Sequence, residues 1–283
     1  MAAFVAFTSI LLDIEFPTTS IEVAMPRRKK QVRLTDRDRL VLTMASVGMV
    51  TPKFVQQGVL QRGSLDGARS IIRRLVGRSP EYLYLRPEPL DGDRVCYRLT
   101  HRGRRVVNAS REAATPLKKQ GRITRYAVTW FIFADKPGHR RLFSLRDYPD
   151  LFDVRDGRLP RHPFFIAQSP DEGTAGVILV DHNASPRRML HKTAKALDKI
   201  LREGWFDDFL RRGRFVITVL TFSDQRKLLY EGHLPRETIR RLGHPLSRLL
   251  PLPLTEESVP FMFRVVPGLE SIVTNTPSLL DRQ

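Results

Sequence analysis

Arginine side chains recur at helical spacing between residues 62 and 78 of this chain. Arg69 and Arg73 are four residues apart, so one face of a helix would carry both guanidinium groups. A guanidinium group can form two parallel hydrogen bonds with a guanine edge, whereas lysine meets phosphate mainly as a point charge. The chemistry predicted here is recognition of a nucleic acid, and an ordinary solvated helix face is the alternative.

The predicted DNA-binding set extends into the neighbouring segments. A basic arm at residues 27–30 is expected to follow phosphates or enter a minor groove, and a solvated charged tail is the alternative. Arginines beside a predicted hairpin are placed for contacts with the DNA backbone. The full set is Arg27, Arg28, Lys29, Lys30, Arg62, Ser64, Arg69, Ser70, Arg73, Arg74, Arg78, Arg94, Arg98 and Arg102.

The positive charge of the chain is concentrated in the same region. Residues 26–125 contain 24 Lys or Arg and 8 Asp or Glu, a net charge of +16, and the whole 283-residue chain has a net charge of +18. Residues 1–25 contribute −3 and residues 126–283 contribute +5. Charge confined to one region indicates a surface for a polyanion. Double-stranded DNA is the predicted partner, ahead of an anionic membrane.

Several other chemistries lack their sequence motifs. There is no phosphate-binding loop, no glycine-rich dinucleotide fingerprint, and no tyrosine-rich motif paired with a histidine triad. His182 and His191 do not have metal-ligand spacing, so surface or capping roles are expected. The single cysteine, Cys96, lies in an apolar run typical of a structural thiol and of a reducing cytosol. No cofactor and no metal are predicted, and a non-enzymatic role is favoured.

The first residues do not form a convincing targeting signal. Residues 1–12 are apolar, but no positive charge precedes them, and Asp13 and Glu15 follow. This pattern is a poor signal peptide and is too short to span a membrane. Residues 1–33 are predicted to be a flexible segment that ends in the basic arm, and translation from Met25 is an alternative. A cytoplasmic, nucleoid- or plasmid-associated location in a bacterium is expected.

Three short helices and a hairpin are predicted over residues 34–112. Thr35 caps the first helix, Thr51 the second, and the third covers residues 64–76. Strand-like runs at 82–86 and 94–99 flank a loop with a turn signal at its end, and a fourth helix follows. Three helices followed by a hairpin are typical of a winged helix-turn-helix, with the hairpin as the wing.

The second half predicts an α/β domain over residues 126–270, after a basic linker at 113–125 and before a tail at 271–283. Its expected strands are 126–133, 164–167, 177–180, 215–220 and 261–266, and its helices are 186–202, one starting at Ser223, and 237–250. The uninterrupted apolar run at 215–220 favours a strand inside the sheet. The predicted fold class is α+β, a winged helix followed by an α/β domain.

Three stretches of the first half resemble the replication-relaxation family of plasmids and other mobile elements. They are Leu34–Asp38, the arginine-rich third helix, and Tyr97–Gly103, whose Tyr-x-Leu-Thr-x-x-Gly pattern many winged-helix regulators share. In the second half, Pro170–Asp171, the strand before Asp181 and the basic helix after it are similar. The resemblance implies DNA binding in plasmid replication, conjugative transfer or transcription control. Replication or transfer proteins would be further partners, and a homodimer is compatible with this role.

The second half also resembles a restriction-endonuclease-like core. In such cores two carboxylates hold Mg²⁺ and a lysine helps to activate water. The resemblance implies Asp171 and Asp181 as the carboxylates and Lys192 as the lysine, but Leu179 and Asn183 stand where an acid and a lysine are usual. We therefore expect a degenerate, non-catalytic core. An Mg²⁺-dependent nuclease or nickase and a protein–protein adaptor are the two alternatives.

Overall fold

The computed structural model describes residues 33–77, 83–91, 94–143, 162–167, 173–246 and 259–269. The described residues from Leu34 onward belong to one compact unit. Helices and two β-sheets are both present, so the protein belongs to the α+β class. No helix within the described ranges has the length and apolar character needed to cross a membrane.

Three helical segments follow one another at the start of the compact unit. They are α1 (Asp36–Val47), α2 (Pro52–Val55) with its π-helical extension η1 (Gln56–Leu60), and α3 (Leu65–Val76). Thr35 caps α1, because its hydroxyl accepts a hydrogen bond from Asp38 N at 3.2 Å while the Asp38 carboxylate accepts one from Thr35 N at 2.9 Å. Thr51 caps α2 through its hydroxyl alone, which accepts a hydrogen bond from Phe54 N at 3.3 Å. The predicted starts of these helices are confirmed.

A two-stranded antiparallel sheet follows α3, and its first strand is longer than predicted. The strands are β1 (Leu85–Asp91) and β2 (Arg94–Leu99). Residues 87–89 and Asp91, predicted as part of a loop, pair with β2, and the register shifts between Pro89 and Asp91. Pro87 and Pro89 are two residues apart in β1, so both lack an N–H group on the same edge of this strand. The other edge of β1 can still form hydrogen bonds with β2. On the far side of β2, Val50 and Tyr97 exchange two backbone hydrogen bonds, at 3.0 and 2.8 Å.

The segment after the hairpin differs most from the prediction. It contains α4 (His101–Val106), the 3₁₀ turn η2 (Arg111–Ala114), α5 (Lys119–Trp130) and the π-helical turn η3 (Phe131–Asp135). The strand predicted at 126–133 is therefore wrong, because this segment is helical, and most of the linker predicted at 113–125 is helical too. The run at 126–133 is apolar at nearly every position, so it shows neither a helix nor a strand period. Such a run also fits a helix that is buried all round.

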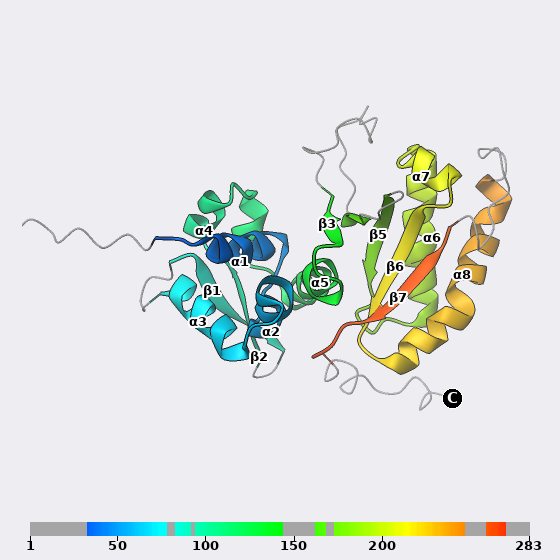
Figure 1. Ribbon diagram of the computed structural model, residues 1–283. Helices are drawn as coiled ribbons and strands as arrows, with labels where there is room; N and C mark the ends of the chain where they lie inside the picture. The colour runs from blue at the N-terminus through cyan, green and yellow to red at the C-terminus, as the bar shows by residue number, and fades with distance from the viewer. Residues whose placement is uncertain are drawn as a thin grey trace, which may run out of the picture. The chain divides into compact units, whose positions relative to one another are not determined.

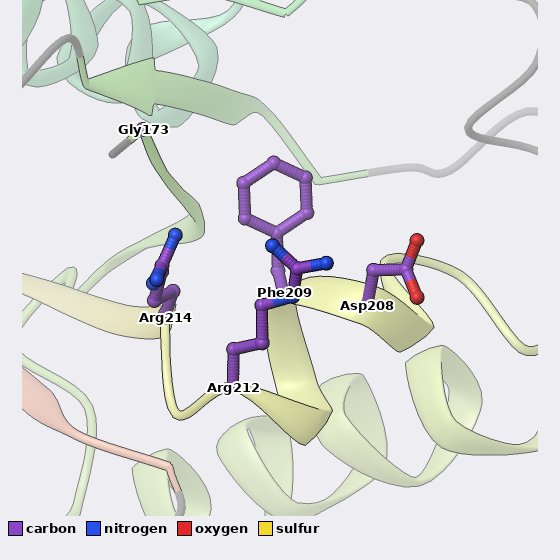
Figure 2. A pocket seen from close by; sticks show the side chains of 5 residues that line it. All are labelled: Gly173, Asp208, Phe209, Arg212 and Arg214. Carbon is purple, nitrogen blue, oxygen red and sulfur yellow. The ribbon is translucent and has the colours of Figure 1, made fainter. Parts of the chain in front are cut away.

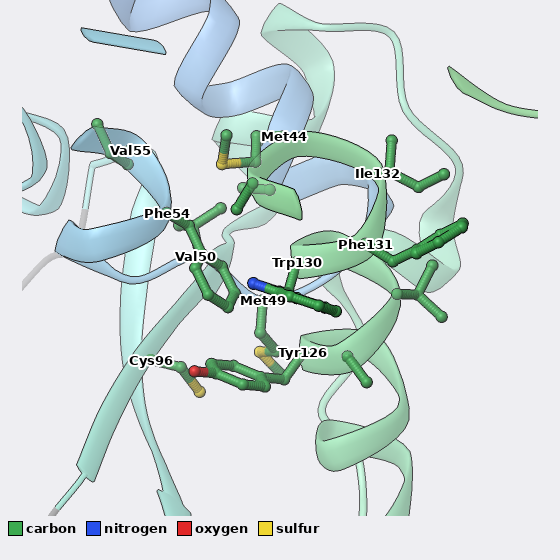
Figure 3. Packing of buried hydrophobic residues seen from close by; sticks show 14 of the residues in the cluster. Met44, Met49, Val50, Phe54, Val55, Cys96, Tyr126, Trp130, Phe131 and Ile132 are labelled. Carbon is green, nitrogen blue, oxygen red and sulfur yellow. The ribbon is translucent and has the colours of Figure 1, made fainter. Parts of the chain in front are cut away.

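Helix α5 packs against the preceding helices. Figure 3 shows Tyr126 and Trp130 beside Met49 and Phe54, and the rings of Phe54 and Tyr126 are 4.6 Å apart. Gly48, which ends α1, approaches α5 so closely that a β-carbon there would lie 2.4 Å from the Thr129 hydroxyl oxygen. One hydrophobic cluster thus runs from α1 through α5 to the larger sheet.

A five-stranded sheet forms the rest of the fold, in the order β3-β4-β5-β6-β7 (Figure 1). The strands are β3 (Arg140–Leu142), β4 (Phe164–Ala167), β5 (Thr174–Val180), β6 (Phe215–Thr221) and β7 (Phe261–Val265). β3, β4 and β5 are antiparallel neighbours, whereas β5, β6 and β7 are parallel. The four strands predicted from 164 onward lie in this sheet, and β3 was not predicted.

Helices cover both faces of this sheet. They are α6 (Pro186–Arg202), α7 (Asp207–Arg211) and α8 (Asp224–Leu246) on one side, and α5 on the other (Figure 1). Helix α6 has the predicted bounds. Helix α8 is continuous where two helices were predicted. Leu234, Thr238 and Leu242 are all buried at a spacing of four residues, so packing holds the helix together across Pro235.

Candidate nucleic-acid interface

Helix α3 has a buried apolar face and an exposed polar face. Ala68, Ile71, Ile72 and Leu75 are buried, which fixes the orientation of the helix. The Ser64 hydroxyl accepts a hydrogen bond from Gly67 N at 3.0 Å and so caps the helix. The exposed side chains are Asp66, Arg69, Ser70, Arg73 and Arg74. The structure thus brings four residues of the predicted DNA-binding set together on one helix surface.

Two of these arginines have carboxylate partners. Arg69 Nη1 lies 2.9 Å from Asp66 Oδ1, and both side chains are at least half exposed, so solvent screens this pair. Arg74 pairs with the buried carboxylate of Asp38 and so joins α3 to α1. Arg73 forms no ion pair with any residue of the described ranges. Arg69 and Arg73 are therefore available to a ligand, whereas Arg74 also has a structural role.

Arg98 is a structural residue, and its predicted contact with DNA is wrong. Its side chain is 6% exposed and forms an ion pair with Glu88. Its Nη1 donates hydrogen bonds to the carbonyl oxygens of Leu99, at 3.1 Å, and Ala114. Side chains alternate along a strand, so Arg98 lies on the same face of β2 as the buried Cys96. That alternation was the sequence signal that Arg98 points inward.

Other arginines of the predicted set lie at the surface near the hairpin. Arg62 precedes α3 and Arg94 begins β2, and both are exposed. Arg102 is exposed on α4, where its guanidinium carbon lies 5.2 Å from the centre of the Tyr84 ring. Five further members of the set, Arg27, Arg28, Lys29, Lys30 and Arg78, lie outside the described residues.

A hollow between α1 and α3 was missed by sequence reasoning. Its lining residues are Thr35, Asp36, Arg37, Ile71 and Arg74. Arg37 and Arg39 are exposed on α1 and add positive charge beside α3. Because both arginines lie on the helix that precedes the predicted helix-turn-helix, the sequence could have indicated that they extend the basic surface. The hollow itself depends on how α1 meets α3, which the sequence does not specify.

The carboxylate of Asp181 is closed off inside the protein. Asp181 follows β5 and is 1% exposed. Its Oδ2 accepts hydrogen bonds from Arg226 Nε at 2.5 Å and from the Tyr230 hydroxyl at 3.0 Å, while its Oδ1 accepts one from Ala184 N at 3.0 Å. Burial raises the pKa of the Tyr230 hydroxyl, which keeps it protonated as a donor. Both oxygens of Asp181 are thus engaged by the protein itself.

Lys192, the lysine of the predicted nuclease site, lies near Asp181 but bonds to a backbone carbonyl oxygen. Lys192 Nζ donates to the carbonyl oxygen of Val180 at 2.8 Å, and burial lowers the pKa of this ammonium group. Asp171 lies outside the described residues. Within the described ranges no three His, Cys, Asp or Glu side chains are placed to share a metal ion.

The two histidines near Asp181 take part in helix contacts. His182 Nε2 lies 3.0 Å from the Thr124 hydroxyl of α5, and burial, with Lys192 as a second cause, lowers the pKa of this imidazole. His191 is exposed on α6 and lies 3.4 Å from Arg241 Nη2 of α8. His191 is therefore at the surface as predicted, whereas His182 is partly buried and links α5 to the loop after β5.

A second hollow, of about 340 Å³, lies at the other end of β5 and β6. It is lined by Gly173, Asp208, Phe209, Arg212 and Arg214. Figure 2 shows Phe209 beside Arg212, and the carboxylate of Asp208 directed away from Arg214. Gly173 borders residues outside the described ranges, so no ligand is assigned to this hollow.

Comparisons with protein-family models, with curated proteins and with solved structures found no match to this chain. The resemblance to the replication-relaxation family therefore stays a prediction. The candidate interface rests on the geometry of α3 and on the charge around it.

Proposed function

We propose that the protein binds double-stranded DNA through a winged helix-turn-helix formed by residues 34–112. The observation that carries this proposal is the outer face of α3, where Arg69, Ser70 and Arg73 are exposed while the opposite face is buried. An exposed helix with arginines four residues apart fits the major groove, where guanidinium groups meet guanine edges and phosphates. The three helices α1, α2 and α3, followed by the β1–β2 hairpin, support the winged-helix assignment.

The residues around α3 are proposed to hold the phosphate backbone. Arg62 precedes α3, and Arg94 and Arg86 lie exposed on the hairpin that would act as the wing. Arg37 and Arg39 of α1 extend the basic surface beside α3. Contacts of this kind position a protein on the duplex without reading its sequence.

The five-stranded part is proposed to be a non-catalytic scaffold of degenerate nuclease-like ancestry. The closed hydrogen bonding of Asp181 supports this role, because a carboxylate held by Arg226 and Tyr230 is not free to ligate Mg²⁺. Combined with the resemblance to the replication-relaxation family, the proposal places the protein in the replication, transfer or transcription control of a bacterial mobile element.

The test is a DNA-binding titration of the full chain and two matched double variants. Arg69→Ala with Arg73→Ala removes the outer cations of α3. Arg211→Ala with Arg240→Ala removes equal charge from two exposed arginines that already pair with Asp207 and Glu237. We expect the α3 variant to bind about 30-fold more weakly or worse, since each such contact contributes roughly 1–3 kcal/mol. The control variant should bind like the wild type.

Salt dependence gives a second readout. If about six phosphates are contacted, affinity should fall by roughly three decades between 50 and 200 mM salt. Normal binding by the α3 variant, or a flat response to salt, would reject the proposal.

A further inference from the structure

Helix α6 carries the net charge of the second half of the chain. Its basic residues are Arg187, Arg188, Lys192, Lys195, Lys199 and Arg202, and its one acidic residue is Asp198. The net charge of the helix is thus +5, which equals the net charge of residues 126–283. The other 18 Lys or Arg in those residues are balanced by 18 Asp or Glu. The positive charge is therefore local to this helix.

Several cations of α6 are exposed, whereas Lys192 points back towards β5, where its Nζ donates a hydrogen bond to the carbonyl oxygen of Val180. Arg187, Arg188 and Lys195 are exposed, and none of them forms an ion pair with a residue that the structure describes. Asp198 is held by Arg202, with Oδ1 2.8 Å from Nε, so it does not neutralise the others. Lys199 Nζ lies 5.0 Å from the centre of the Trp205 ring, which favours a fixed position for this ammonium group.

This charge pattern opposes the stability of the helix that carries it. Arg187 and Arg188 occupy the first turn, where the helix dipole is positive and disfavours cations. Arg188 and Lys192, and also Lys195 and Lys199, are like charges four residues apart, a spacing at which they repel. Local choices that work against the fold are expected at functional surfaces.

The apolar side of α6 is already occupied. Met189, Leu197 and Ile200 are buried in the cluster that joins α6 to the sheet and to α8. A helix that binds a lipid surface inserts its apolar face into the bilayer. Because that face of α6 is not free, the geometry disfavours a membrane and favours a partner that meets only the cations.

We propose that the outward face of α6, defined by Arg187, Arg188, Lys195 and Lys199, binds the phosphate backbone of DNA as a second contact surface. Arg188 and Lys199 are 11 residues apart, which corresponds to about 16 Å along a helix. This length matches the axial rise of about five base pairs. The contact is with phosphates, so it adds affinity without sequence discrimination. The inference rests on the proposed function and extends the DNA contact beyond the α3 surface.

The test compares two double variants of the full chain on a fluorescent duplex of mixed sequence. Arg188→Gln with Lys195→Gln removes two cations of α6 that form no ion pair with a described residue. Arg211→Gln with Arg240→Gln is the control for charge, since these side chains are 63% and 76% exposed and pair with carboxylates on their own helices. Loss of two phosphate contacts should lower the slope of log affinity against log salt by about 1.8, and affinity at 100 mM salt by about 60-fold. The control should change neither.

Each result decides between named possibilities. If the α6 variant keeps the wild-type slope while the Arg69→Ala, Arg73→Ala variant loses binding, this inference fails and the proposed function stands. If neither variant loses binding, both fail. Anionic phosphatidylserine vesicles serve as a second probe, and loss of vesicle binding with unchanged DNA binding would assign α6 to a membrane instead. Thermal melting checks the fold, and Arg187→Gln with Lys195→Gln provides a second variant with the same expected outcome.

Discussion

The carboxylate of Asp181 and the guanidinium of Arg226 form a buried ion pair between residues 45 positions apart, with Oδ2 2.5 Å from Nε. Asp181 follows β5, and Arg226 lies in the first turn of α8. The pair therefore fixes α8 to the carboxyl edge of the sheet that it covers. Tyr230, one turn further along α8, donates a hydrogen bond to the same oxygen. A residue that the resemblance to nuclease cores implies as a metal ligand thus anchors a helix.

Removing Arg226 should destabilise the protein strongly. Arg226→Leu leaves the Asp181 carboxylate buried without its cation, and loss of one partner of a buried ion pair costs about 3–5 kcal/mol. Urea unfolding at pH 7 measures the change in the free energy of unfolding. Arg211→Leu, which breaks the exposed pair with Asp207, is the control and should cost less than about 1 kcal/mol.

A double variant separates the charge effect from the packing effect. Asp181→Leu combined with Arg226→Leu removes both charges, so it should be more stable than Arg226→Leu alone. If the single variant were as stable as the Arg211→Leu control, Asp181 would not depend on Arg226, and the anchoring role would be wrong.

The same geometry leads us to expect no Mg²⁺-dependent cleavage by Asp181. Supercoiled plasmid incubated with the protein and Mg²⁺ or Mn²⁺ should stay supercoiled on an agarose gel, because both oxygens of Asp181 are held by protein donors. Nicking that disappears in Asp181→Asn but persists in Arg211→Leu would contradict this and restore the nuclease alternative.

Alanine substitutions of two arginines in β2 should have different effects. Arg98→Ala should lower stability, whereas Arg94→Ala should mainly lower DNA affinity. Arg98→Ala leaves the Glu88 carboxylate nearly buried and unpaired, so we expect a loss of about 3–5 kcal/mol in the free energy of unfolding. Arg94→Ala removes an exposed side chain, and should weaken DNA binding while lowering the free energy of unfolding less than Arg98→Ala does. Urea unfolding and a DNA titration, run on both variants, check the contrast. A stable Arg98→Ala protein with weakened DNA binding would return Arg98 to the interface.

Sequence reasoning succeeded where a local rule determines the structure. The Thr35 and Thr51 caps are short-range hydrogen bonds between residues that lie within three positions of each other. Helix α6 was predicted with its observed bounds, because an apolar stripe, a capping serine and a proline at its first position all agree. The exposure of Arg69 and Arg73 follows from the same helical periodicity.

Sequence reasoning failed where the structure of a segment depends on residues that are far away in the sequence. The run at 126–133 is apolar almost throughout, so its pattern fits a buried strand as well as a buried helix, and in the structure it is helical and packs between α1 and the large sheet. The prolines of β1 suggested a loop, although their positions on one edge allow pairing. Nothing local shows that Arg226 reaches Asp181, so the ion pair that closes the predicted catalytic position was not foreseeable from either residue.

The stability of the protein should depend on His162 in mildly acidic solution. Burial, with Lys192 and Lys199 as further causes, lowers the pKa of His162 from 6.5 to about 4. Between these values the unfolded chain binds a proton at this site and the folded chain does not. Stability is therefore complete above about pH 6.5 and falls as the pH decreases towards 4. Urea unfolding at pH 7 and pH 4.5 should show that His162→Gln loses less stability than the wild type, by about 2–3 kcal/mol at most.

The wild type and the His162→Gln variant differ only at this residue, so the difference between their losses of stability reports on His162 and not on other groups that titrate in this range. Burial also lowers the pKa of His182, so part of the pH dependence should remain in the His162→Gln variant. An equal loss of stability in both proteins between pH 7 and pH 4.5 would show that His162 is not buried as a neutral imidazole. In that case the surroundings of His162, including its approach to Lys192 and Lys199, would need to be revised.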